Sequence, residues 1–386
     1  MTGALLIRGG RLGDVVTDVL VLGGRIAALG PDAVDAAPPG VQPVDADGLI
    51  VAPGFIDLQV NGAAGHDFTR EPAAIWSVGV TLARHGVTAF LATIVTAPPG
   101  AIVAALEAWT DGAPDGAAGA LPLGLHLEGP YLSEARRGAH PSEYLRQPDR
   151  AEPAGWSRKR GVRLVTLAPE VPGALQLVAD LSSRGVVVSA GHSAADAAIG
   201  AAAIEAGVRY GTHLFNAMPQ LHHREPGLAG ALLADERVTV GLICDGLHVA
   251  PSMLDLAWRA VGPGRFSVVS DVIAALGMPS RRVPLGNAEV IVEDQMAHLE
   301  DGTLAGAVAG LDAGLRQLVA ATGCTAAQAI ATVTSVPARL LGLGGGRGTI
   351  RAGGRADLAL LTDELEVAAT LVGGRVAHAM EPDRWA

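Results

Sequence analysis

The stretch PGFIDLQVNG, residues 53–62, has the composition of a buried β-strand that follows a turn and contains polar residues near its end. Similar apolar runs recur along the middle of the chain, and Ala-rich segments of helix length separate them. Including the first run, they span 51–60, 87–95, 121–129, 162–170, 186–192, 210–217, 238–248 and 266–272. Near-continuous apolar strands that alternate with helices are typical of a parallel sheet covered on both faces. Eight such units predict a (β/α)8 TIM barrel.

The two ends of the chain have a different pattern from the middle. Short Val, Leu and Ile runs alternate there with Gly-rich turns, as in DVLVLGGRIAALG (18–30) and VAATLVGGRVAHA (367–379). This pattern is typical of β-hairpins. We therefore expect residues 1–50 and 345–386 to form one small β-sandwich domain, and residues 51–344 to form the barrel. An open doubly wound sheet is the alternative for the middle, but no Gly-x-Gly-x-x-Gly turn follows the first strand.

The composition excludes several classes of partner. The chain has 386 residues and a net charge of −11, which argues against binding to the phosphate backbone of nucleic acids. No run approaches the ~20 apolar residues of a membrane helix, and the N-terminus MTGALLIR reaches a charge before a signal-peptide core forms. Cys244 and Cys324 lack the spacing of a metal site or a disulfide framework. These features predict a cytoplasmic protein that binds neither nucleic acid nor membrane.

Polar residues suited to catalysis stand at the ends of four predicted strands. Glu128 ends the third strand, His192 the fifth, His213 the sixth and Asp271 the eighth. The carboxyl ends of barrel strands form the active site of this fold, so the four side chains should converge. Two imidazoles and a carboxylate are a common ligand set for catalytic zinc. A further Asp could act as general base and acid.

Each of these residues also has a structural explanation. A single His at a strand end is more often a hydrogen-bonded structural residue, and Asp271 could cap a helix. The recurrence of suitable side chains at equivalent positions of a repeating unit favours the metal site. The only lysine in the sequence is Lys159, in the polar run WSRKR, so a carboxylated lysine that bridges two metals is not expected. The sequence therefore predicts one metal ion.

Short motifs spread along the chain carry a resemblance to a known family. They are PGFIDLQVNG, HLEGPYL, RRGAH, GHS, GTHLFNAM, HHREPG, DGLHV and SDV, followed by PARLLGL and GTIRAGGRADLALL. In this order they resemble the N-acetylglucosamine-6-phosphate deacetylases of the amidohydrolase superfamily. The resemblance implies metal-dependent hydrolysis of the acetamide of N-acetyl-D-glucosamine 6-phosphate to D-glucosamine 6-phosphate and acetate. Some members of the family hold a second metal with His-x-His on the first strand. Gln59 and Asn61 occupy these positions here, which implies a single-metal enzyme.

The resemblance also implies roles for individual residues. Glu128, His192 and His213 are the implied ligands of one divalent ion, for which zinc is favoured and iron, cobalt and manganese are suitable. Asp271 matches the residue that deprotonates the attacking water and then protonates the leaving amine. The implied substrate-contacting residues are Ala139, His140, Asn216, Ala217, Arg224 and His248. His248 could stabilise the oxyanion or bind elsewhere on the sugar phosphate. In the family the arginine loop can reach into a neighbouring subunit, which implies a homodimer.

The chain departs from the family pattern at two positions, and other functions stay open. Val272 stands where the family commonly has a small residue, and Ala307 where it commonly has Ser. These departures could reshape the pocket around the sugar, so a related N-acyl amino sugar is an alternative substrate. A cyclic amide is another, although such hydrolases usually have the His pair on the first strand. A non-catalytic sugar-phosphate sensor is the alternative outside enzymes, and it predicts the loss of Asp271 or of a metal ligand.

Overall fold

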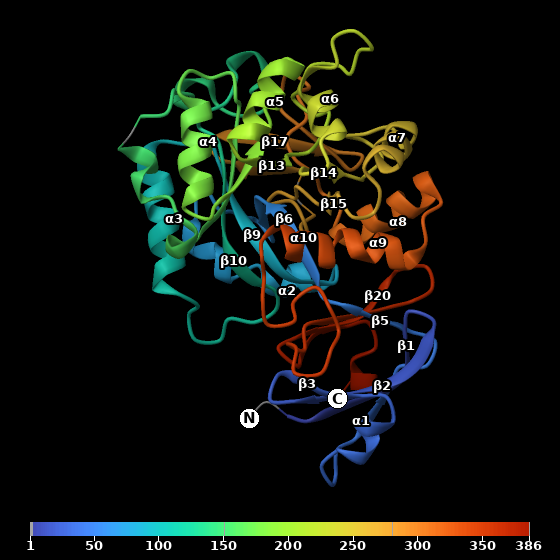
Figure 1. The fold of residues 1–386 in the computed structure, drawn as a ribbon. Coiled ribbons are helices and arrows are strands. Elements are labelled where there is room, and N and C mark those ends of the chain that lie inside the picture. Colours follow the sequence, from blue (N-terminus) through green and yellow to red (C-terminus); the bar gives the residue numbers. More distant parts are fainter. Residues whose placement is uncertain (1–2, 150, 280, 386) are drawn as a thin grey trace.

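The computed structural model describes residues 3–149, 151–279 and 281–385, and its central element is a parallel β-barrel (Figure 1). The barrel strands follow one another in sequence order around the sheet. They are β6 (Phe55–Val60), β9 (Val87–Val95), β10 (Leu121–Glu128), β11 (Val162–Leu167), β12 (Val187–Ala190), β13 (Val208–Gly211), β14 (Thr239–Ile243) and β15 (Phe266–Val269). A bridge between Val60 and Val272 joins the first strand to the segment after the last. The predicted TIM barrel is confirmed, and each strand overlaps its expected range.

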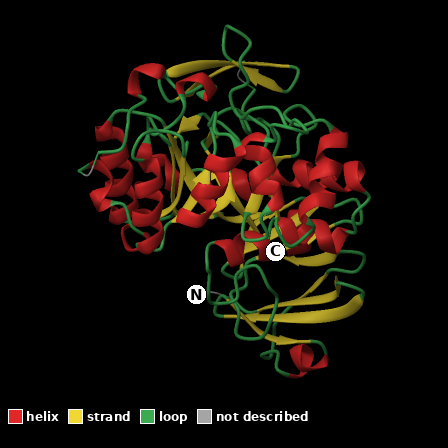
Figure 2. Cartoon of the chain, turned by 45° about the horizontal axis from the view of Figure 1, so that its top comes forward, coloured by secondary structure: helices red, strands yellow, loops and turns green. Residues whose placement is uncertain are grey.

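Helices surround the barrel in a ring (Figure 2). They are α2 (Gly79–Ala83), α3 (Pro99–Asp111), α4 (Ala174–Ser183), α5 (Ala197–Ala206), α6 (Gly227–Ala234), α7 (Pro251–Val261), α8 (Leu311–Thr322), α9 (Ala326–Thr332) and α10 (Ser335–Leu340). Local sequence sets several of their ends. The side chain of Asp196 accepts the N–H of Ile199 at the start of α5, and Thr325 and Gln328 form a capping box on α9. With helices outside and side chains filling the inside, every residue of β9 is buried.

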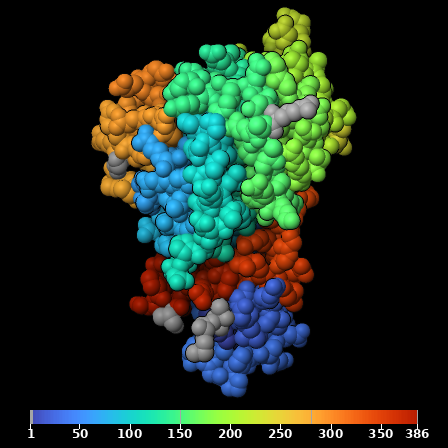
Figure 3. Space-filling view, turned by 90° about the vertical axis from the view of Figure 1, so that its left-hand side faces the viewer, coloured from blue at the N-terminus to red at the C-terminus, as the bar shows by residue number. Residues whose placement is uncertain are grey.

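Strands from both ends of the chain form the small domain below the barrel, where Figure 3 shows the N-terminal and C-terminal segments side by side. One half contains β1 (Leu5–Leu12), β2 (Val15–Leu22), β3 (Arg25–Leu29) and β4 (Pro43–Asp45); the other contains β5 (Ile50–Pro53), β19 (Leu358–Leu361), β20 (Val367–Val372) and β21 (Arg375–Ala379). A single register pair, Arg11 with Ile50, connects the two halves into one mixed sheet. Val19 and Leu360 belong to one buried cluster, so the halves share a core as the predicted sandwich requires. The short helix α1 (Pro31–Asp35) lies beside β2 and β3.

The run predicted as one strand over 51–60 is two strands in the structure. Strand β5 pairs with β19 in the small domain, whereas β6 pairs with β9 in the barrel. Gly54 separates them, and a Cβ atom there would lie 2.2 Å from Cγ2 of Thr88. Only glycine allows the chain to pass this closely from one sheet to the other.

A further antiparallel sheet was not predicted. It consists of β16 (Arg282–Leu285), β17 (Ala288–Glu293) and β18 (Met296–His298), between β15 and α8. A short pair, β7 (Gly62–Ala63) and β8 (His66–Asp67), follows β6. Asp67 holds the turn after β16, because its carboxylate accepts the backbone N–H of Gly286 at 3.1 Å. In the described part of the chain no helix is both long and apolar enough to cross a membrane.

Candidate active site

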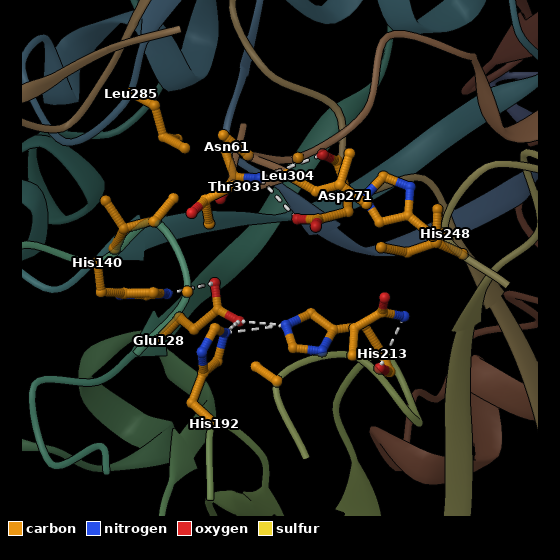
Figure 4. A pocket seen from close by; sticks show the side chains of 18 of the residues that line it. Asn61, Glu128, His140, His192, His213, His248, Asp271, Leu285, Thr303 and Leu304 are labelled. Carbon is orange, nitrogen blue, oxygen red and sulfur yellow. Dashed lines mark hydrogen bonds and ion pairs between the residues drawn. The ribbon is translucent and has the colours of Figure 1, made fainter. Parts of the chain in front are cut away.

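The loops after the barrel strands enclose a cavity of about 380 Å³ (Figure 4). Most of the site residues predicted from the sequence line it: Asn61, Glu128, Ala139, His140, His192, His213, Asn216, Ala217, His248 and Asp271. Gln59 is not among the residues that line the cavity, but its side chain contacts Glu128. Arg224 lies outside it, on an exposed loop before α6, where its guanidinium is 2.9 Å from Nε2 of His223.

Glu128, His192 and His213 direct their donor atoms at one another. Oε1 of Glu128 lies 3.3 Å from Nε2 of His192 and 3.1 Å from Nε2 of His213, and the two Nε2 atoms are 3.0 Å apart. Metal–ligand distances of about 2.0–2.2 Å with tetrahedral angles would separate ligand atoms by roughly 3.4 Å. The near-equilateral triangle in this structure therefore fits a small divalent cation.

The surroundings of this triangle support the same interpretation. Nδ1 of His192 lies 3.0 Å from the carbonyl oxygen of Arg136, which can only accept, so Nδ1 carries the proton and Nε2 keeps its lone pair. Burial by itself would raise the pKa of Glu128, but the neighbouring imidazoles of His192 and His213 hold that pKa well below the usual range. A buried, ionised carboxylate beside two imidazoles is consistent with a divalent metal site.

His140 also approaches this cluster, with Nε2 3.7 Å from Oε2 of Glu128. Its ligand atom and those of Glu128 and His192 all lie within 4.8 Å of one another. However, Nδ1 of His140 accepts the backbone N–H of Thr96 at 3.2 Å, so the proton of the neutral ring is on Nε2. Burial and the neighbouring His192 lower the pKa of His140 to about 3, which keeps the ring neutral. His140 therefore presents a hydrogen-bond donor to the cavity and no metal-binding lone pair.

The backbone at the strand ends has an unusual conformation that aims these side chains. His192, His213 and Asp271 have φ angles of 49°, 28° and 53°, in the left-handed region that non-glycine residues rarely adopt. Such backbone strain clusters at functional sites, because the surrounding structure must hold it in place. Each residue lies just after the end of its strand, and Figure 4 shows the three side chains pointing into the same cavity.

Asp271 faces the metal cluster from the other side of the cavity. Burial, together with the negative charge of Glu128, raises its pKa to about 6, while His213 and the amide of Asn61 oppose the shift. Nδ2 of Asn61 lies 2.8 Å from Oδ1 of Asp271. The carboxyl can therefore exchange a proton close to neutral pH.

The comparisons with known proteins agree with this geometry. The model of the amidohydrolase family matches residues 50–377, which is most of the chain. The chain belongs to the amidohydrolase family.

This amidohydrolase is also similar to proteins with more specific names. It is 39% identical to the N-acetylglucosamine-6-phosphate deacetylase of Homo sapiens, over 97% of this chain and 94% of the human protein. It is 37% identical to an N-acetylgalactosamine-6-phosphate deacetylase of Escherichia coli, with 89% and 92% covered. The crystal structure of N-acetylglucosamine-6-phosphate deacetylase from Pasteurella multocida matches with a TM-score of 0.89 at 28% identity, over 97% of this chain and 99% of that one. The resemblance recognised from the motifs is confirmed.

The structure of this amidohydrolase adds a residue that the sequence analysis missed. Oδ2 of Asp245 lies 2.7 Å from Nδ1 of His248, and both side chains are almost fully buried. Because the carboxylate accepts, Nδ1 carries the proton and Nε2 of a neutral His248 is left with a lone pair. The signal was present in the motif DGLHV, where the Asp stands three residues before the His.

The two departures from the family pattern do not reach the cavity of this amidohydrolase. Val272 and Ala307 are buried and pair with each other in a β-bridge behind it. The cavity wall is formed instead by residues 303–306 and by Leu285 of β16. The expected reshaping of the pocket by these two substitutions can therefore act only indirectly, through the backbone that they support.

Proposed function

We propose that this amidohydrolase hydrolyses the acetamide of N-acetyl-D-glucosamine 6-phosphate to D-glucosamine 6-phosphate and acetate, in amino-sugar catabolism and cell-wall recycling. The observation that carries the proposal is the triangle of Glu128, His192 and His213, which faces Asp271 across one cavity. The names of full-length relatives supply the substrate class.

Glu128, His192 and His213 are the proposed ligands of one divalent cation. Zinc is the favoured ion, because two imidazoles and a carboxylate are a common zinc ligand set; iron, cobalt and manganese also suit it. When bound, such a cation acts as a Lewis acid toward a carbonyl oxygen and lowers the pKa of water. His140 is not a proposed ligand, because its Nε2 carries a proton.

Asp271 is the proposed general base and acid. It takes a proton from water as the oxygen bonds to the acetyl carbon, and it delivers that proton to the nitrogen as the carbon–nitrogen bond breaks. An amide nitrogen is a poor leaving group until it gains a proton, so both transfers are needed. A pKa of about 6 allows the carboxyl to be ionised at neutral pH and to regain a proton readily.

The remaining cavity residues are proposed to bind the substrate. Nε2–H of His140 and the backbone of Ala139 are proposed to contact the sugar, and Asn216 and Ala217 are proposed to contact the phosphate. His248, oriented by Asp245, is proposed to contact the oxyanion with a protonated ring or to accept a hydrogen bond from the sugar with a neutral one. We propose that Arg224 binds the phosphate from the partner subunit of a homodimer. A cytoplasmic location is proposed on the basis of Cys244 and Cys324, which are free and buried.

A second candidate substrate is N-acetyl-D-galactosamine 6-phosphate. The relative named for that activity covers as much as 89% of this chain at 37% identity. The two sugars differ only in the orientation of one hydroxyl group, at C4. Contacts in the same cavity would therefore discriminate between them.

Acetate release by the purified protein tests these proposals. The substrates are the two N-acetylhexosamine 6-phosphates and unphosphorylated N-acetylglucosamine, each with and without a metal chelator. We expect chelator-sensitive release from the glucosamine ester and at least tenfold less from the unphosphorylated sugar. A preference for the galactosamine ester would replace the proposed substrate. No release from any of them by metal-loaded protein would contradict the deacetylase function. The alternatives would then be an amidohydrolase that acts on another amide, such as a cyclic one, or a non-catalytic sugar-phosphate sensor.

A further inference from the structure

Gln59 and Asn61 each direct a side-chain amide at a carboxylate of the site. Nε2 of Gln59 lies 3.1 Å from Oε1 of Glu128, and Nδ2 of Asn61 lies 2.8 Å from Oδ1 of Asp271. An ionised carboxylate oxygen only accepts hydrogen bonds, so each amide must present its NH₂ group. The Oε1 atom that Gln59 contacts is the atom that faces both histidines. Gln59 therefore holds the oxygen that a metal ion would use.

Hydrogen bonds of the backbone hold together the two segments that carry Gln59, Asn61 and Asp271. The N–H of Asp271 donates to the carbonyl oxygen of Gln59 at 3.0 Å, which ties β6 to the segment after β15. The buried carboxylate of Asp57 accepts the N–H of Gln59 and the N–H of Ser270, each at 3.2 Å. One side chain therefore fixes the backbone of both segments, from which the amides and the carboxylate of Asp271 extend.

Packing alone does not explain why these two positions carry amides. Gln59 and Asn61 are 1% and 3% exposed, and in the described residues their carbonyl oxygens have no hydrogen-bond partner. A buried acceptor without a partner destabilises a fold, so an aliphatic side chain of similar volume would pack at least as well. What only the amides supply is partial positive charge beside two carboxylates in one buried cavity.

We propose that Gln59 and Asn61 are positioning residues whose amide NH₂ groups orient the carboxylates of Glu128 and Asp271. The inference rests on the proposed deacetylase function and on the proposed metal ligands. Gln59 holds Glu128 in place for the cation, and Asn61 holds Asp271 in place for proton transfer. The two residues therefore affect different steps, although they are two positions apart on one strand.

Leucine substitutions separate the two roles. Gln59→Leu should raise the Kd for Zn²⁺ about 10–100-fold, which is the effect of losing a partner of a metal ligand, while kcat at saturating zinc stays within about threefold of wild type. Asn61→Leu should leave the Kd for Zn²⁺ within about twofold and lower kcat about 10–100-fold, with KM within about threefold. Competition with a chromophoric chelator measures the Kd, and acetate release measures kcat and KM.

Thr88→Val is the matched control. Thr88 is 1% exposed and its hydroxyl donates to the carbonyl oxygen of Phe55 at 3.4 Å, away from the cavity. We expect zinc affinity, kcat and KM to stay within about twofold of wild type.

Several results would overturn the assignment. If Gln59→Leu binds zinc as tightly as wild type, Gln59 does not support the metal ligand Glu128. An Asn61→Leu protein with unchanged kcat, or with zinc affinity as weak as that of Gln59→Leu, removes the separate role of Asn61. If wild-type protein releases no acetate, the proposed function fails, whereas the zinc titration of Gln59→Leu still decides whether Gln59 supports Glu128.

Discussion

The pKa of Asp271 is set by neighbours with opposing effects. Burial raises it most, the charge of Glu128 adds to the rise, and His213 and Asn61 lower it, with a result of about 6. At neutral pH the carboxyl is therefore mostly ionised and can accept a proton. As pH falls through this pKa, the carboxyl becomes protonated and loses that capacity.

Asp271→Asn keeps the shape of the side chain and removes the proton acceptor. We expect kcat to fall about 10²–10⁴-fold with little change in KM, which is the usual effect of losing a general base. Wild-type kcat/KM should fall as the pH drops below about 6, and the residual activity of the variant should lack this acid limb. Acetate release between about pH 4.5 and 8 measures both profiles. Full turnover by the variant would contradict the role of Asp271.

The sequence was sufficient to find these residues but not to orient them. Glu128 and Asp271 could be selected because each follows an apolar run and because parallel strand ends meet at one edge of the barrel. The proton position on His140 depends on Thr96, which is 44 residues away, and no local pattern reports such a contact. The left-handed backbone at His192 and His213 could not be predicted from the sequence either, since neither is a residue type that requires it.

At the scale of elements, strand identity was more predictable than strand boundaries. Runs such as β9 are buried along their whole length, so composition alone identifies them. The division of the first run at Gly54 depends on the approach of Thr88 from a neighbouring strand. The sheet of β16, β17 and β18 was not predicted, in part because residues of its strands such as Arg282 and Glu289 are exposed. In addition, the turn after β16 is held by Asp67, which is distant in the sequence.

Gly54→Ala tests the passage between the two sheets. The added Cβ would meet Thr88 at 2.2 Å, so we expect the free energy of unfolding to fall by about 1–3 kcal/mol, as overpacking in a core does. Gly100→Ala is the control, because nothing lies within 4 Å of its Cβ position in α3. That variant should be unchanged or up to about 1 kcal/mol more stable. Urea unfolding measures both, and equal stability of the two variants would contradict the steric argument.

At the scale of the whole molecule, the position of Arg224 bears on assembly. The residue lies on an exposed loop and does not line the cavity of its own chain. A two-fold dimer can bring such a loop to the partner's cavity, because the same patch serves both subunits. In that arrangement a complete site needs Asp271 from one chain and Arg224 from the other.

Mixing two inactive variants tests this arrangement. After subunit exchange of equal amounts of Arg224→Ala and Asp271→Asn, about half of the dimers are hybrids, and each hybrid has one complete site. Activity should therefore recover to about a quarter of the wild-type value. A mixture of wild type with Asp271→Asn is the control and should give about half. If the mixture is no more active than the two variants measured separately, Arg224 acts in the site of its own subunit or in no site.

The construction of the small domain from both chain ends has a consequence for synthesis on the ribosome. Strands β1 to β5 emerge first, but the buried cluster that contains Val19 and Val21 also includes Leu358 and Leu371, which are synthesised last. The barrel can therefore fold before the N-terminal strands of the small domain have paired with the C-terminal ones. The last strands complete the core of the small domain. A chain released before they are made therefore exposes apolar side chains to aggregation and proteolysis.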